Sequence, residues 1–447
     1  MAKKILIVGG VGGGATVAAQ IRRANKEDEI ILLEKGGHVS FSNCGMPYYI
    51  GGTIENRDAI LYSKEKFSEK FQVEVRTFTE VTAIDRSNKE ITYCSKTGNH
   101  QETYNTLILS PGASAVMPSI KGMNRERTFS LHTIPDMDAI HAYIETNQPK
   151  SAAVIGGGFV GLEMIENLHA KGITCKLIDR SEQVMNVIDA DMARIVQEYL
   201  TKKNIEVRLN DGLHHFSNDG KLLHVNSGGT IQADLTIMAV GIRPNTKLAV
   251  DASLEIGKTG AILVNTFMQT SDPSIYALGD VVETKDPITG HGRNIALAGP
   301  AHRQAFVIAN HLNGKPITYN GTYGTNILKL FDLTIGSTGH NSDSLEAYGK
   351  SYDVATLQSL SNASYYPGAD KLWIKVLFDK QHGTILGGQV VGHAGVDKRL
   401  AVLATAIKGK LTVFDLSDLE LGYAPPYSSP KDPINILGYK ASSKLEQ

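Results

Sequence analysis

Cysteine is scarce in this chain of 447 residues, which has only three: Cys44, Cys94 and Cys175. They lie far apart, and none forms a CxxC pair or another spacing typical of a metal site, so the sequence predicts no metal ligands. Sparse cysteine is typical of a protein kept in a reducing compartment rather than of a secreted domain held by disulfides. We therefore expect a cytoplasmic protein.

Long apolar runs and an excess of one charge are also missing. Residues 3–8 join a basic pair to an apolar run, but glycine ends that run too early for a signal peptide. No stretch is apolar over the length that a transmembrane helix requires. Lys and Arg number 45 against 46 Asp and Glu, a net charge of −1, so the sequence indicates neither nucleic acid nor an anionic membrane as a partner.

Glycine, by contrast, is abundant, with 44 residues, and many gather in two clusters. In the first, an apolar strand (residues 4–8) leads into the glycines of residues 9–14, a helical pattern from Ala15 and a second strand that ends at Glu34. This order is the dinucleotide-binding fingerprint, in which glycines let a pyrophosphate approach the helix N-terminus and the acid binds a ribose. The match is imperfect, because Val11 stands at the middle glycine.

A second copy of the pattern strengthens the prediction. A strand-like run leads into Gly156, Gly158 and Gly161 in register, and the next strand ends at Asp179 at about the spacing of twenty residues that the fingerprint requires. Two complete units predict two nucleotides, a flavin and a nicotinamide. Asp179 favours the ribose of NADH, whereas the adjacent Arg180 suits the 2′-phosphate of NADPH, so we expect both to be used, with NADH at least competitive.

Further segments fit the same arrangement. Residues 107–112 and 237–245 are apolar strands that end in Pro/Gly turns, and we expect them to mark crossings between two nucleotide domains. The strand that ends at Asp280 places an acid where it can bind a ribityl chain. From about residue 325 the apolar residues alternate as in half-buried antiparallel strands, and residues 394–408 have an amphipathic helical pattern.

Cys44 is the candidate reactive thiol. It lies in the stretch SFSNCGMPY (residues 40–48), shortly after the first nucleotide unit, and a helix that begins there is expected to lower the pKa of the thiol. A lone cysteine is more often an inert core residue, and we interpret Cys94 and Cys175, which lie in strand-like runs, as structural. The proline-rich, aromatic tail, residues 421–432, is either a surface loop or part of a binding site.

Over essentially the whole chain, these motifs and their order resemble the flavin-dependent pyridine nucleotide-disulfide oxidoreductases. Most of that family carry CxxxxC, but Tyr49 stands five positions after Cys44, as in the single-cysteine members: coenzyme A-disulfide reductases, NADH peroxidases and water-forming NADH oxidases. SFSNCGMPY and the tail YAPPYSSPKD (residues 423–432) look like the coenzyme A-disulfide reductases. Gly12 stands where the peroxidases and oxidases carry a histidine that assists oxygen or peroxide chemistry.

The resemblance implies an α/β fold with two Rossmann-like dinucleotide-binding domains, for FAD and NAD(P)H, followed by an α+β C-terminal dimerisation domain. It also implies a homodimer in which the partner chain completes the active site. The expected domains are residues 1–149 (FAD, first part, with the redox cysteine), 150–240 (NAD(P)H), 241–324 (FAD, second part) and 325–447 (dimerisation).

The resemblance further implies which residues act. Cys44 is the redox-active nucleophile, and Tyr365 and Tyr423 lie over the cysteine of the other subunit. The implied cofactor contacts are Gly9, Gly12, Gly14, Glu34, Gly112, Gly156, Gly158, Gly161, Asp179, Arg180, Gly241 and Asp280. The implied coenzyme A contacts are Thr16, Gln20 and Arg23, which share one helix face, with Ser40, Asn43, Arg303, Tyr427 and Lys431.

The implied reaction is the reduction of coenzyme A disulfide to two coenzyme A thiols by NAD(P)H, through FAD and a mixed disulfide of Cys44. Two alternatives stay open close to it: a peroxidase or oxidase that cycles Cys44 through sulfenic acid, and a polysulfide or persulfide reductase. More distant is a flavoprotein whose cysteine is incidental, either an electron-transfer reductase for a protein partner or a redox-sensing binding protein.

Overall fold

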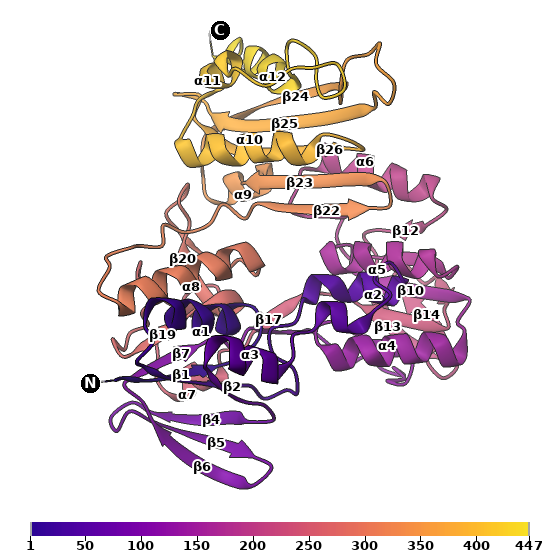
Figure 1. Cartoon of the computed structure of the whole chain (residues 1–447). Coiled ribbons are helices and arrows are strands. Elements are labelled where there is room, and N and C mark those ends of the chain that lie inside the picture. Colours follow the sequence, from indigo (N-terminus) through magenta and orange to yellow (C-terminus); the bar gives the residue numbers. More distant parts are fainter. Residues whose placement is uncertain (1, 446–447) are drawn as a thin grey trace. The chain divides into compact units, whose positions relative to one another are not determined.

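The computed structural model describes residues 2–445, which fold into two compact units. Unit 1 is formed by the chain up to Val116, His132–Ala139 and Ile242–Thr322, and unit 2 by Met117–Leu131, Ile140–Gly241 and the chain from Tyr323. Most of the helices and strands of both are labelled in Figure 1. The four-part division at residues 150, 241 and 325 stays a prediction.

Unit 1 is built on a parallel five-stranded sheet in the order β19–β7–β1–β2–β3. Its strands are almost entirely apolar and buried, as in parallel sheets that are covered on both faces. The elements are β1 (Lys4–Val8), α1 (Gly13–Ala24), β2 (Glu29–Leu33), α2 (Met46–Gly51), α3 (Lys64–Phe71), β3 (Glu74–Arg76), β7 (Thr106–Leu109), α7 (Lys247–Asp251), β19 (Ile275–Ala277) and α8 (Ala298–Leu312).

Helix α1 begins at Gly13, two residues before the predicted Ala15, because glycines have no side chain and leave no helical pattern in the sequence. Smaller sheets complete unit 1. They are the meander β4 (Glu80–Asp85), β5 (Glu90–Ser95) and β6 (Gly98–Thr103), the pair β8 (Ala113–Ala115) and β17 (Ile242–Pro244), and the group β18 (Ile262–Leu263), β20 (Val282–Lys285) and β21 (Gly292–Arg293).

The pair β8 and β17 lies where the chain leaves unit 1 and where it returns. The turns at residues 107–112 and 237–245 therefore do mark crossings, as the sequence predicted. The second of these segments is not one strand, however. It divides into a strand of unit 2 and β17, because Gly241 has a φ of +108° and turns the chain between them.

The first part of unit 2 is a second parallel five-stranded sheet, in the order β12–β11–β10–β16–β9, with a meander of three strands. Its elements are β9 (Thr128–Phe129), α4 (Ile134–Asn147, divided between the units), β10 (Ser151–Ile155), α5 (Phe159–Ala170), β11 (Thr174–Ile178), α6 (Ala190–Lys202), β12 (Glu206–Arg208), β13 (Leu213–Ser217), β14 (Leu222–Val225), β15 (Thr230–Gln232) and β16 (Leu235–Met238).

The C-terminal part of unit 2, which we call the C-terminal domain, is an antiparallel sheet with helices, as the alternating pattern predicted. The sheet order is β22–β23–β26–β25–β24. The elements are β22 (Asn326–Leu330), β23 (Leu333–Gly339), α9 (Ser342–Ala347), β24 (Tyr352–Leu360), β25 (Lys371–Asp379), β26 (Ile385–Gly392), α10 (Val396–Gly409), α11 (Val413–Asp418) and α12 (Pro433–Ser442). The predicted helix at residues 394–408 is α10.

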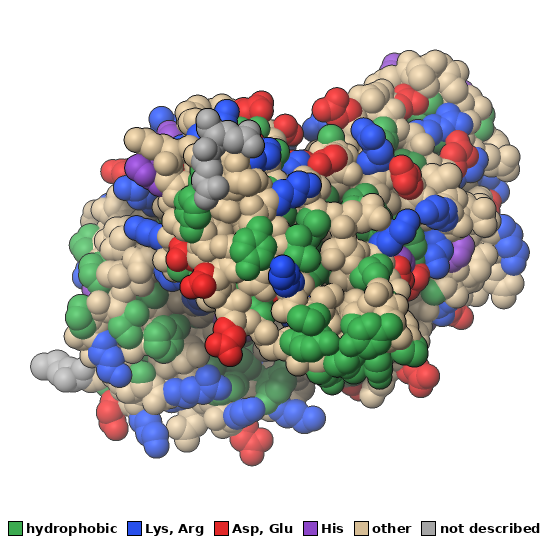
Figure 2. All heavy atoms as spheres, turned by 90° about the horizontal axis from the view of Figure 1, so that it is seen from above, with side chains coloured by type: hydrophobic (Ala, Val, Ile, Leu, Met, Phe, Trp, Pro, Cys, Tyr) green, Lys and Arg blue, Asp and Glu red, His purple; other side chains and the backbone are tan. Residues whose placement is uncertain are grey.

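The surface reflects the balanced composition. On the face shown in Figure 2, Lys and Arg side chains alternate with Asp and Glu, and no large region carries charge of one sign. Within residues 2–445, no helix combines the length and the apolar character needed to cross a membrane.

Candidate functional site

The first glycine turn, between β1 and α1, has the shape of a pyrophosphate cradle. A Cβ on Gly9 would lie 2.1 Å from the carbonyl oxygen of Ser110, and one on Gly14 would lie 1.8 Å from the carbonyl oxygen of Gly9. Both positions therefore require glycine. At Gly12, by contrast, no heavy atom lies within 4 Å of the Cβ position, so the backbone at the helix N-terminus is open to a ligand. This arrangement fits the FAD pyrophosphate.

Glu34, at the end of β2, is buried and fixed by backbone donors. Its Oε2 accepts a hydrogen bond from the N–H of Gly10 (2.7 Å), and its Oε1 accepts one from the N–H of Gly36 (2.6 Å). A carboxylate has about four lone-pair sites, so each oxygen keeps one for a ribose hydroxyl. Gly112, at the end of β7, is also open, with a φ of +64° and no heavy atom within 4 Å of its Cβ position.

The turn after β19 is held by two side chains that the sequence analysis missed. The N–H of Gly279 donates to Oε1 of the buried Gln304 (2.7 Å), and Asn294 donates to the carbonyl oxygen of Asp280 (2.9 Å). Burial raises the pKa of the Asp280 carboxyl, and the nearby His132 opposes this shift. Gln304 directly follows His302 and Arg303 in α8, so no local pattern distinguishes it from a surface residue.

The second glycine turn, between β10 and α5, repeats the first. A Cβ on Gly156 would lie 2.3 Å from the carbonyl oxygen of Ala239, and one on Gly161 would lie 1.9 Å from the carbonyl oxygen of Gly156. Gly158 is exposed at the N-terminus of α5, with no heavy atom within 4 Å of its Cβ position. Two glycines that leave no room for a side chain, and a third with free space around it, fit the approach of a dinucleotide.

Asp179, at the end of β11, repeats the role of Glu34. Its Oδ2 accepts from the N–H of Gly157 (2.6 Å) and its Oδ1 from the N–H of Ser181 (2.8 Å). Arg180 is exposed directly beside it, and Gly241, which follows β16, is exposed at the same end of the sheet. The cofactor residues expected in unit 2 therefore all lie at the carboxyl ends of its parallel strands, where open α/β sheets bind nucleotides.

Cys44 is exposed in a single turn of 3₁₀ helix, Asn43–Gly45, which continues directly into α2. The predicted helix after the cysteine is therefore present, although α2 has only six residues. Ser40 adopts a φ of +51°, and its N–H donates to the carbonyl oxygen of Gly10 (2.9 Å). This bond ties the cysteine loop to the first glycine turn. The Asn43 amide donates to the carbonyl oxygen of His132 (2.9 Å).

The three residues expected on one helix face all lie on α1. Thr16 and Gln20 are half-buried, and Arg23 is exposed, with its guanidinium 5.4 Å from the centre of the Phe71 ring. Helix α1 packs against α8, which carries the exposed Arg303. Unit 1 therefore contains the cysteine loop, the first glycine turn and both arginines that are expected to contact coenzyme A.

Tyr365 and Tyr423 meet in the C-terminal domain. Their hydroxyl oxygens lie 3.1 Å apart, and both side chains are largely exposed, at 73% and 45%. The hydrogen bond between the two hydroxyls raises the pKa of Tyr423. The resemblance named both residues for one role, and the fold brings them together although they are 58 positions apart in the sequence.

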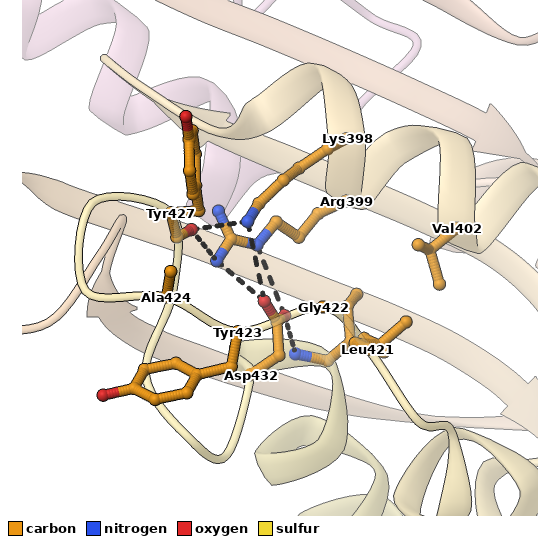
Figure 3. Close-up of a pocket in the computed structure, with 10 residues that line it drawn as sticks. Lys398, Arg399, Val402, Leu421, Gly422, Tyr423, Ala424, Tyr427 and Asp432 are labelled. Carbon is orange, nitrogen blue, oxygen red and sulfur yellow. Dashed lines mark hydrogen bonds and ion pairs between the residues drawn. The ribbon is translucent and has the colours of Figure 1, made fainter.

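The tail lines a pocket of about 520 Å³, together with the start of α10 (Figure 3). Arg399 is buried and donates to Oδ2 of Asp432 at 2.8 Å, and Lys398 donates to the carbonyl oxygen of Tyr427. Tyr427 is exposed, as is Lys431 further along the tail. The tail is therefore anchored by a buried ion pair and is not a simple surface loop. Sequence reasoning missed Lys398 and Arg399, whose only signal was a basic pair near the start of an amphipathic helix.

The two remaining cysteines differ from each other. Cys175, in β11, is buried, and burial raises the pKa of its thiol to about 12, which fits a structural residue. Cys94, in β5, is exposed at the surface of the meander.

Comparison with known proteins shows the class of this chain. The family model of the pyridine nucleotide-disulphide oxidoreductases matches residues 3–305, and the model of that family's dimerisation domain matches residues 326–432. The chain belongs to this family. It is therefore an oxidoreductase that uses FAD and a pyridine nucleotide, which confirms the expected fold class and cofactors.

Individual relatives cover nearly the full length. Over 442 residues, the chain is 39% identical to the coenzyme A disulfide reductase of Staphylococcus aureus (strain JH9), covering 98% of this chain and 99% of that one. The crystal structure of reduced Bacillus anthracis CoADR-RHD is 46% identical, with a TM-score of 0.98 over 100% of this chain and 81% of that one. A NAD-dependent persulfide reductase from A. fulgidus is 33% identical, with a TM-score of 0.96 over 99% and 84%.

Proposed function

We propose that this protein reduces coenzyme A disulfide to two coenzyme A thiols, with FAD as its bound cofactor and NADH or NADPH as the reductant. The observation that supports the proposal is the exposed Cys44, whose loop is tied to the first glycine turn by a backbone hydrogen bond from Ser40. Tyr49 replaces the second cysteine of a CxxxxC dithiol, so the mixed disulfide forms with the substrate. The names of the Staphylococcus and Bacillus relatives support this substrate.

Cys44 reacts in two half-reactions. Its thiolate attacks one sulfur of coenzyme A disulfide, forms a mixed disulfide and releases one coenzyme A thiolate. Two electrons and a proton then cleave the mixed disulfide, which releases the second coenzyme A thiol and restores the Cys44 thiolate. FAD supplies the two-electron link between the nicotinamide and sulfur. The chain's glycine turns, Glu34 and Asp179 hold the two nucleotides in place for this transfer.

Coenzyme A binds unit 1 along α1. Thr16, Gln20 and Arg23 share one helix face, which suits the polar and phosphate groups of the nucleotide end. Ser40 and Asn43 adjoin the cysteine and orient the pantetheine arm. The remaining substrate contacts that we propose are Arg303, Tyr427 and Lys431.

The active form is a homodimer. The chain has the family's dimerisation domain, and the hydroxyl pair of Tyr365 and Tyr423 is exposed on it. We place this pair over Cys44 of the other subunit, where a tyrosine hydroxyl protonates the leaving thiolate.

The sparse cysteines suit a cytoplasmic location. Within unit 2, residues 150–240 and 325–447 form separate NAD(P)H-binding and dimerisation domains.

A persulfide or polysulfide reductase is the second candidate, because a NAD-dependent persulfide reductase matches 99% of this chain. A persulfide sulfur would take the place of the coenzyme A sulfur at Cys44. A peroxidase or oxidase fits less well. Gly12 is exposed at the first helix N-terminus, and glycine has no side chain that can act as an acid or base for peroxide chemistry.

The test is anaerobic oxidation of NADH by the purified flavoprotein, with coenzyme A disulfide, a polysulfide and hydrogen peroxide supplied in parallel. We expect rapid turnover on the first, which Cys44→Ser abolishes while the flavin spectrum is retained. Cys94→Ser, the same change at another exposed cysteine, serves as the control and should keep full activity. Turnover on peroxide alone, or full activity of Cys44→Ser, would contradict the proposal. A marked preference for the polysulfide would favour the second candidate.

A further inference from the structure

The segment that follows Asp179, residues 180–188, runs back over the second glycine turn, and we call it the nucleotide loop. The N–H of Met185 donates to the carbonyl oxygen of Gly157 (3.0 Å), and the Met185 side chain is buried. Within the loop, the Asn186 amide donates to Oγ of Ser181 (3.1 Å). Asn186 therefore holds the Ser181 hydroxyl, whereas the Ser181 backbone is held by Asp179 and by the N–H of Asn210, which donates to its carbonyl oxygen (2.9 Å).

The far end of the nucleotide loop is held by the C-terminal domain of the same unit. The Asn341 amide donates to the carbonyl oxygen of Asn186 (3.0 Å). Asp189, which begins α6, accepts from the N–H of Ser342 (2.8 Å) and from its Oγ (2.9 Å). Its Oδ2 also lies 2.6 Å from Nζ of Lys375.

These contacts form a specific polar site rather than general packing. Lys375 on β25 and Gln389 on β26 are cross-strand partners, so their side chains lie on the same face, and Oε1 of Gln389 accepts from the N–H of Asp189 (2.9 Å). The side chains of Lys375 and Asp189 are only 8% and 6% exposed. Burial of two charges is costly unless each is paired in good geometry, so the ion pair holds Asp189 in one position against Lys375. The four contributing residues are called the clamp: Asn341, Ser342, Lys375 and Gln389.

We propose that the clamp positions the nucleotide loop for recognition of the 2′-phosphate of NADPH. This inference rests on the nucleotide site proposed above for the second glycine turn. Asp179 is held by β11 and by the N–H of Gly157, which lie outside the clamp, so the ribose contact of NADH does not depend on it. Arg180 is exposed, and the Ser181 hydroxyl beside it, a second donor for a phosphate, is oriented by Asn186 of the loop. Loosening the clamp therefore weakens NADPH binding more than NADH binding.

The test is Lys375→Met in the holoenzyme, with the dissociation constants of NADP⁺ and NAD⁺ measured by titration. We expect the constant for NADP⁺ to rise about fivefold to tenfold, the effect of losing one orienting contact, and the constant for NAD⁺ to stay within about twofold. The kcat at saturating NADH should not change, because the residues that contact substrate are intact. Lys375→Arg, which retains a cation beside Asp189, should restore most of the NADP⁺ affinity.

Two controls make the result decisive. Lys371→Met makes the same change at an exposed residue of the same strand and should leave both constants unchanged. Arg180→Ala probes the proposed site directly and should weaken NADP⁺ binding. If Lys375→Met does not fold, Asp189→Asn with Lys375→Met removes the ion pair without leaving a lone buried charge.

Each contrary outcome has its own meaning. One contrary outcome is that Arg180→Ala weakens NADP⁺ binding while Lys375→Met weakens the binding of neither nucleotide, or of both equally. In that case the clamp is merely structural and the inference is wrong. If Arg180→Ala leaves NADP⁺ binding unchanged, the proposed phosphate contact is wrong, and the inference falls with it.

Discussion

Replacing Asp432 by asparagine should strongly destabilise the tail, because it breaks a buried ion pair. Arg399 is 1% exposed and Asp432 is 6% exposed, and Arg399 Nη2 lies 2.8 Å from Asp432 Oδ2. Removal of one partner from such a pair leaves the other charge buried without compensation, at a cost of about 3–5 kcal/mol. Asparagine keeps the shape and still caps α12, so the loss reports the charge rather than the helix cap.

The effect should depend on pH in a defined direction. Burial by itself would raise the pKa of Asp432, but hydrogen bonds from Arg399, the Ile434 N–H and Ser428 outweigh it and lower the pKa. A carboxyl whose pKa is lower in the folded state contributes stability above its unfolded pKa of about 3.9 and loses it as the pH falls through the folded value. The difference between wild type and Asp432→Asn should therefore be full at pH 7 and shrink below about pH 4.

The assay is thermal melting of the holoenzyme at pH 7, where we expect the midpoint to fall by at least about 5 °C. Asp397→Asn is the matched control, since it makes the same change at an exposed residue on α10, the helix that carries Arg399. Asp432→Asn with Arg399→Met should recover much of the lost stability, because no lone charge stays buried. A midpoint for Asp432→Asn equal to that of Asp397→Asn would refute the reasoning.

Three further predictions concern the nucleotide and thiol sites. Gly161→Ala should destabilise unit 2, because its Cβ would lie 1.9 Å from the Gly156 carbonyl oxygen. Gly158→Ala should melt at the wild-type temperature but bind NADH weakly, because its Cβ position is open. Equal melting temperatures of the two variants would contradict this. Burial, with nearby Glu166, raises the pKa of Glu163 to about 7, so its charged form destabilises the folded state above that pH. Glu163→Gln should therefore raise the melting midpoint more at pH 8 than at pH 5. An equal rise at both pH values would contradict the prediction. Tyr423→Phe should lower kcat for coenzyme A disulfide about 10²-fold with an unchanged flavin spectrum, and an unchanged kcat would remove the hydroxyl from the mechanism.

Local sequence patterns predicted most of the fold. The strands before both glycine turns are short apolar runs bounded by glycine, and the structure has them as β1 and β10. The sequence places the start of α1 two residues late, because glycine contributes no periodicity. For residues 237–245 it predicts an apolar strand that ends in a Pro/Gly turn, whereas the chain turns at Gly241 and then forms a further strand, β17. Both differences lie at turns, where backbone conformation rather than side-chain pattern decides the structure.

The residues that the sequence analysis missed are buried polar side chains. Lys375 lies in a run that otherwise reads as core, whereas Gln304 and Arg399 directly follow other polar or charged residues on their helices. Whether such a residue is a surface group or a buried partner depends on a second residue far along the chain. For Lys375, that partner is Asp189, which belongs to the other half of unit 2. Periodicity contains no information about such pairs.

The sequence by itself determined the two dinucleotide units and the lone thiol beside the first, because glycine turns, strand ends and a missing second cysteine are local features. Only the tertiary structure decided which distant groups meet. It joined the hydroxyls of Tyr365 and Tyr423, buried Arg399 against Asp432, and fixed the nucleotide loop to the C-terminal domain. Hydrogen bonds and ion pairs act only over a few ångströms, so these contacts exist once packing has brought remote segments together.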